Sequence, residues 1–173
     1  LGSSVTELRR FVADRAGLVG IALVTFLAGV VAGYQFGVST GIEVGTQPPT
    51  RDVFGPFPLD TAINLSANNW QVAIAQAYAG LAFGLPVLGN LAFNGAIVGG
   101  LAGLGFDLAT FAALVVPHGI VEVPALAVGG AVGLFLAGRG WAVVRGRIAP
   151  EEGGKALRRA FLVLLGLAPV FLV

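Results

Sequence analysis

Two ionisable side chains, His118 and Glu122, lie within an otherwise apolar stretch and are the residues of this sequence best suited to chemistry. They are four positions apart, so a helix places them on one face. Ionisable residues at membrane depth are costly and commonly mark functional sites. The pair could relay a proton, ligate a metal, act as general acid and base, or form a hydrogen-bonded pair that locks a structural element.

The residue inventory weighs these four interpretations differently. A zinc site needs three or four ligands, and the chain has only one histidine and no cysteine, so His118 and Glu122 are weak metal candidates. No nucleophile motif accompanies them, so no catalytic residue is assigned and no enzyme activity or cofactor is expected. The best-supported interpretation is a structural pair that contacts Asn94, Asn69 or Gln76, and a proton relay ranks second.

The composition predicts a multi-pass membrane protein. Charged residues make up 11% of the chain and hydrophobic residues 56%, with a mean hydropathy of +0.89. Soluble domains carry about 25% charged residues, so this chain has too little polar surface to face water. The net charge of +1 offers no basic stripe for a phosphate backbone, so no nucleic-acid partner is expected.

Hydropathy and turn residues predict an all-α bundle of about five spans in a single transmembrane domain, with the lipid bilayer as its surroundings. The spans are expected at residues 18–36, 67–87, 90–106, 120–138 and, incompletely, 160–173. Residues 37–66 read as an outer loop rich in proline. Residues 108–116 are too short to cross and read as a half-helix, which Pro117 and Gly119 separate from the fourth span.

Two further groups of residues are candidates for packing or function. A polar set accompanies His118 and Glu122 within the apolar stretch: Asn68, Asn69, Gln76, Asn90 and Asn94. Glycines spaced by four suggest close helix approach at Gly29, Gly33, Gly80, Gly84, Gly95, Gly99, Gly103, Gly129 and Gly133. Because these faces exceed what internal packing requires, a homodimer is also expected.

The distribution of basic residues predicts the orientation. Three arginines precede the first span and six basic residues lie in 139–159, whereas the 37–66 loop has only one. Because basic segments stay in the cytoplasm, the N-terminus is expected to be cytoplasmic in a plasma-membrane protein.

Three motifs carry a resemblance to a known family. They are Asn68-Asn69-x-x-Val72-Ala73, Asn90-x-x-x-Asn94-Gly95 and Pro117-His118-Gly119-x-x-Glu122. Together they resemble the stage II sporulation protein M family, over roughly residue 18 to the end. The resemblance implies a protein of about five spans that acts in engulfment in spore formers, as the membrane scaffold for two partners that degrade peptidoglycan. Members usually end their last span with an acidic residue, a feature that this chain lacks.

The function expected from the sequence is therefore a membrane scaffold or permease-like subunit of an envelope complex. The first alternative is a small-molecule or ion transporter or channel that uses the helix break at Pro117–Gly119. The second alternative is an intramembrane metal-dependent enzyme.

Overall fold

The computed structural model describes residues 2–41, 59–104 and 108–172. Within these ranges it does not describe the side chains of 59–63, 65–66, 108–110, 112–114, 116–118 and 172. Every regular element in the described residues is helical, which confirms the all-α prediction. The α-helices are α1 Gly2–Asp14, α2 Ala16–Ser39, α3 Leu59–Ala79, α4 Leu85–Gly103, α5 Leu108–Val144 and α6 Pro150–Leu167. Two 3-10 turns, η2 Gly80–Ala82 and η3 Ala168–Leu172, complete the set.

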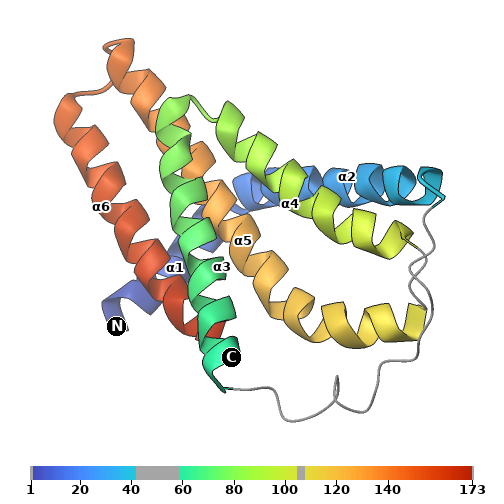
Figure 1. The fold of residues 1–173 in the computed structure, drawn as a ribbon. Coiled ribbons are helices and arrows are strands. Elements are labelled where there is room, and N and C mark those ends of the chain that lie inside the picture. Colours follow the sequence, from blue (N-terminus) through green and yellow to red (C-terminus); the bar gives the residue numbers. More distant parts are fainter. Residues whose placement is uncertain (1, 42–58, 105–107, 173) are drawn as a thin grey trace.

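Helix α5 organises the bundle because it contributes to both hydrophobic cores. One core joins it to α1, α3 and α6 around Phe11, Phe135 and Val163, which are almost fully buried. The other joins it to α2 and α4 around Phe26 and Leu91. Figure 1 shows α1, α3 and α6 on one side of α5 and the α2–α4 pair extending away on the other.

The predicted break at Pro117 and Gly119 is wrong, because α5 is continuous from Leu108 to Val144. The separate half-helix 108–116 and the fourth span 120–138 are parts of this single helix. Proline removes one backbone hydrogen bond and kinks a helix, but an apolar helix packed among others tolerates the loss. Figure 1 shows that α5 curves along its length, which fits Pro117 and Pro124 acting as bends.

The boundary between the second and third predicted spans is also displaced. It lies at residues 80–84, not at 88–89, so α3 ends at Ala79 and α4 begins at Leu85. Phe83 and Gly84 adopt left-handed backbone angles, with φ of 62° and 86°, and these reverse the chain. Pro86 lies in the first turn of α4 instead of ending α3, a position where its missing N–H costs nothing.

Two helices begin earlier than the hydropathy pattern predicts. Helix α3 starts at Leu59, inside the predicted 37–66 loop, and α6 starts at Pro150, not at residue 160. Both first turns are polar or contain proline, so they fall outside an apolar window. In α6, Pro150 and the acidic Glu151 and Glu152 are favourable first-turn residues because the helix dipole is positive there.

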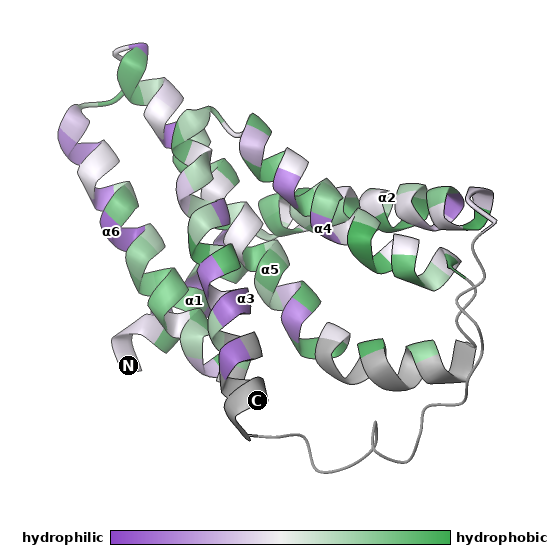
Figure 2. Ribbon diagram, in the orientation of Figure 1, coloured by the Kyte–Doolittle hydropathy of each residue, from purple (hydrophilic) through white to green (hydrophobic). Residues whose placement is uncertain are grey.

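Three helical segments are long and apolar enough to cross a membrane, as expected of a membrane protein: Ala16–Ser39, Leu85–Gly103 and Gly119–Val144. Figure 2 shows the difference in hydropathy, with polar residues recurring along α6 and few on α2 or α5. Helices α3 and α6 carry more polar residues and do not meet both criteria. The count of five spans therefore stays a prediction.

Glycines bring α2 and α4 into backbone contact. A Cβ at Gly29 or Gly33 would overlap the backbone of Ala92 or Ala96. From the other side, a Cβ at Gly95 or Gly99 would overlap the backbone carbonyls of Phe26 and Val30. Small residues on both helices thus let the two backbones approach as closely as membrane helices can.

The N-terminal helix α1 is held against α6 by one arginine. Arg159 Nε donates to Glu7 Oε1 at 2.5 Å, and Arg159 Nη2 donates to Asp14 Oδ2 at 2.8 Å. The hydrogen bond to Asp14, supported by that to Glu7, raises the pKa of the Arg159 guanidinium. Because Arg159 and Glu7 are mostly buried, this pair is screened less than a surface ion pair.

We expect Glu7→Gln to reduce the free energy of unfolding by about 1 kcal/mol, because it removes the charge that faces Arg159 but keeps the shape. Glu152→Gln is the matched control, since its partner Lys155 and Glu152 are both exposed. Thermal unfolding in detergent measures both variants. Equal melting temperatures for the two would show that the α1–α6 pair contributes nothing to stability.

The orientation can be tested with single cysteines, because the chain has none. Cysteine at position 50 should react with an impermeant maleimide from outside, and Ala149→Cys should react only after the membrane is opened, because the basic segment stays inside. Ala149 is preferred to Gly146, whose φ of 63° disfavours a side chain. If both cysteines react from outside, an even number of helices crosses between them, and the five-span topology is wrong.

Candidate functional site

A pocket of about 280 Å³ lies where four helices meet, and several of the predicted polar residues line it. Asn69 comes from α3, Asn94 from α4 and Glu122 from α5, while Phe26 of α2 supplies an aromatic wall. Gly119 also lines the pocket, so the former helix-break position contributes open space there. Three of the candidate residues, far apart in sequence, thus converge on one cavity.

Asn90 and Asn94 form a hydrogen-bonded pair along α4. Asn94 Nδ2 donates to the backbone carbonyl of Asn90 at 2.8 Å and to Asn90 Oδ1 at 3.0 Å. These bonds occupy the two N–H groups of the Asn94 carboxamide, so its Oδ1 is left as an acceptor. Asn90 therefore orients Asn94 without lining the pocket itself.

Glu122 is the one acidic residue among those that line the pocket. Among the described side chains, the structure gives its carboxylate no hydrogen-bond or ion-pair partner. An ionised carboxylate accepts hydrogen bonds and donates none. In apolar surroundings such a group favours a cation or a proton beside it.

Gln76 lies deeper along α3 and faces α5. Its side chain is 2% exposed, and its Nε2 lies 3.5 Å from the backbone carbonyl of Leu126. A Cβ at Gly130 would come within 2.6 Å of Gln76 Nε2 and would also crowd Leu91 and Ala22. The absent side chain of Gly130 is therefore what lets the buried amide reach α5.

The remaining polar candidates do not line the pocket. Asn68 is exposed, and both Asn68 and Asn69 lie inside α3, so their predicted role as N-terminal caps of a span is wrong. The backbone of Pro117 and His118 belongs to α5, one turn before Glu122, but their side chains lie outside the described residues. The predicted His118–Glu122 contact therefore stays a prediction.

The other glycine positions also contact neighbours within the chain. A Cβ at Gly80 would overlap the backbone of Gly133, and Gly129 faces Ala73. Gly84 is used differently, because it provides the left-handed turn before α4. The glycine spacing thus has a use inside one chain and gives no separate support for the homodimer.

Sequence reasoning missed an aromatic and cationic cluster on the far side of α5. Phe135 packs edge-to-face on Phe11 with ring centroids 5.6 Å apart. The guanidinium carbons of Arg15 and Arg139 lie 5.3 and 5.6 Å from the centroid of the Phe135 ring. Arginine and phenylalanine are far apart in the sequence here, so no local spacing signals the cluster.

Metal ligation gains no partner from the fold. Within the part of the chain that the structure describes, no three His, Cys, Asp or Glu side chains come together. Glu122 has carboxamides beside it, and two carboxamides with one carboxylate are a poor match to the ligands that zinc prefers.

Comparison with known proteins identifies the family and nothing finer. No curated protein and no solved structure matches the chain. A family model described as Stage II sporulation protein M matches residues 21–173, which is most of the chain and includes every residue of the pocket. With its all-helical fold and three membrane-compatible segments, the chain belongs to the stage II sporulation protein M family.

Proposed function

We propose that this protein is a membrane scaffold that gathers envelope partners, including peptidoglycan-degrading proteins, through the α2–α4 pair. The supporting observation is the exposure of this pair. Only 22% of the apolar stretch of α2 is buried inside the chain and 22% of that of α4, against 56% for α5. The family is not a known enzyme family, which agrees with a role in assembly.

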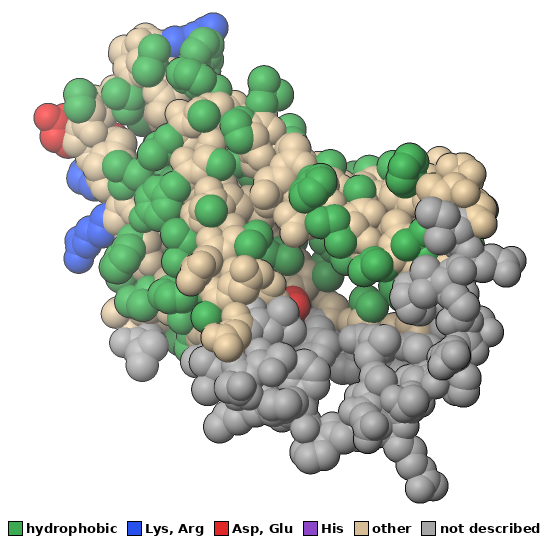
Figure 3. Space-filling view, in the orientation of Figure 1, with side chains coloured by type: hydrophobic (Ala, Val, Ile, Leu, Met, Phe, Trp, Pro, Cys, Tyr) green, Lys and Arg blue, Asp and Glu red, His purple; other side chains and the backbone are tan. Residues whose placement is uncertain are grey.

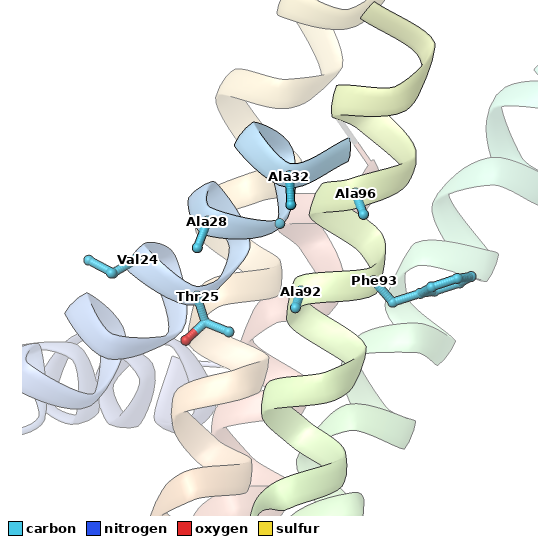
Figure 4. Close-up of a pocket in the computed structure, with 8 residues that line it drawn as sticks. Val24, Thr25, Ala28, Ala32, Ala92, Phe93 and Ala96 are labelled. Carbon is cyan, nitrogen blue, oxygen red and sulfur yellow. The ribbon is translucent and has the colours of Figure 1, made fainter. Parts of the chain in front are cut away.

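A shallow groove between α2 and α4 supports this assignment. It has a volume of about 570 Å³ and is lined by small residues of both helices, among them Ala28, Ala32, Ala92 and Ala96. Figure 4 shows these alanines on the two facing helices, with Val24 and Phe93 at the outer edges. Small side chains in a membrane favour close packing of another helix, so the occupant proposed is an apolar helix of a partner.

Charge is concentrated away from this groove. Figure 3 shows Lys and Arg side chains over α6 and the turn that precedes it, whereas hydrophobic side chains cover most of the rest of this face. A basic end is attracted to an anionic membrane surface, while the apolar α2–α4 pair stays in the bilayer. This arrangement leaves α2 and α4 available to partner helices.

Site-specific crosslinking tests the scaffold proposal. A photoreactive amino acid at Phe93 should crosslink in native membranes to peptidoglycan-degrading partners, identified by mass spectrometry. Ala92→Leu should remove the crosslink by filling the groove, whereas Leu101→Ala, on an exposed part of α4 that does not line the groove, should not. Crosslinks to lipid alone would contradict the proposal, and a product of twice the chain mass would assign the groove to a homodimer.

A second candidate function is transport of a small molecule or ion. The observation in its favour is the polar pocket that contains Glu122, since transporters place polar residues where membrane helices meet. Uptake into proteoliposomes should then depend on Glu122, and Glu122→Gln should abolish it without lowering the melting temperature. An impermeable vesicle with wild-type protein would remove this candidate.

A further inference from the structure

We propose that the pocket at Glu122 binds a small organic cation with an ammonium group. The inference starts from the polar atoms that face the cavity. Glu122 contributes a carboxylate, and Asn94 contributes an oxygen, because its amide N–H groups are already donated to Asn90. A site of this kind offers acceptors, so it selects a ligand that donates hydrogen bonds and carries positive charge.

The aromatic wall favours the same class of ligand. Phe26 is 4% exposed and lines the pocket from α2, opposite the polar residues of α3 and α4. Cations are attracted to the face of an aromatic ring, and alkylammonium ions are recognised this way in other proteins. Val123 and Leu126 complete an apolar surface that an alkyl chain can contact.

The size of the cavity separates an organic cation from a metal ion. A volume of about 280 Å³ is an order of magnitude larger than the roughly 30 Å³ that one water molecule occupies. Hard metal cations take about six oxygen ligands at close range, whereas one carboxylate and two carboxamides line this pocket. An ammonium group needs only about three acceptors and leaves room for an alkyl chain.

This inference is independent of the scaffold function, because partner binding uses the outer face of α2 and α4 and the ligand uses the interior. It would name a substrate class if the protein transports, and an effector class if the protein only assembles partners. Binding and flux are measured separately, so failure of one does not imply failure of the other.

Isothermal titration of the full-length protein in detergent tests the proposal, with butylammonium chloride as the probe and butan-1-ol as its neutral counterpart. We expect saturable binding of butylammonium, no saturable binding of butanol, and at least tenfold weaker binding by Glu122→Gln. The control Glu152→Gln, on the exposed part of α6, should bind like the wild type.

A second variant covers the case in which Glu122→Gln fails to fold. A Cβ at Gly119 would meet no atom within 4 Å, yet Gly119 lines the pocket, so Gly119→Val should fill the cavity and abolish binding while the chain stays folded. Gly20→Val, on α2 and equally unhindered, controls for added apolar volume. Unchanged affinity in folded Glu122→Gln or Gly119→Val would overturn the proposal, as would equal saturable binding of butanol or of sodium ion.

Discussion

Gly33→Ala should abolish the packing of α2 on α4 and cost about 3 kcal/mol or more of stability. The added Cβ would overlap the backbone of Ala96, and a backbone cannot move aside as a flexible side chain can. Because the same close approach continues at Gly29, the two helices would have to separate along much of their contact. Size-exclusion profiles and melting temperature in mild detergent should show mostly misfolded or aggregated protein.

The control for this prediction lies on the same helix. A Cβ at Gly20 would meet no atom within 4 Å, so Gly20→Ala should be neutral or slightly stabilising, since alanine favours helix more than glycine. Gly100→Ala is intermediate, because its Cβ would lie 3.8 Å from the carbonyl oxygen of Gly33, an ordinary contact. If all three variants melted alike, the α2–α4 interface would not depend on the absence of side chains.

Phe135→Ala is expected to cost about 4 kcal/mol, because the ring is 6% exposed and joins α5 to the α1–α2 junction. Its removal would leave a cavity beside Phe11 and take away the aromatic face that Arg15 and Arg139 contact. A loss of this size should lower the melting temperature by roughly 10 °C.

Two variants define what the Phe135 result means. Phe161→Ala removes a ring that is 56% exposed on α6, so it should change the melting temperature far less. Phe135→Leu keeps most of the apolar volume but loses the ring face, and it should fall between wild type and alanine. If Phe161→Ala were as destabilising as Phe135→Ala, the core at the α1–α5 contact would be of no special importance.

The two residue groups behind these predictions differ in how far sequence foresaw them. The four-residue glycine spacing on α2 and α4 is visible in the sequence, and it indicates that something approaches closely. Only the fold shows that Gly33 meets Ala96 and Gly80 meets Gly133. The cluster at Phe135 has no sequence signature, because its members come from α1, the α1–α2 junction and α5.

The candidate site divides in the same way. The spacing of Asn90 and Asn94 predicts a shared helix face, and the structure joins them by hydrogen bonds. The sequence also singled out Asn69 and Glu122 because polar residues are rare in this stretch. It did not establish that the two line one pocket with Phe26, since that depends on how α2, α3, α4 and α5 dock.

The sequence by itself determined the helical membrane class, because low charge and long apolar runs leave no other way to satisfy the backbone in a bilayer. Helix ends were decided by the fold where local signals were ambiguous. Pro117 reads as a break but lies inside α5, and Pro86 reads as an end but begins α4. A proline's local chemistry is the same in both places, and the neighbouring helices determine whether the chain bends, starts or stops there.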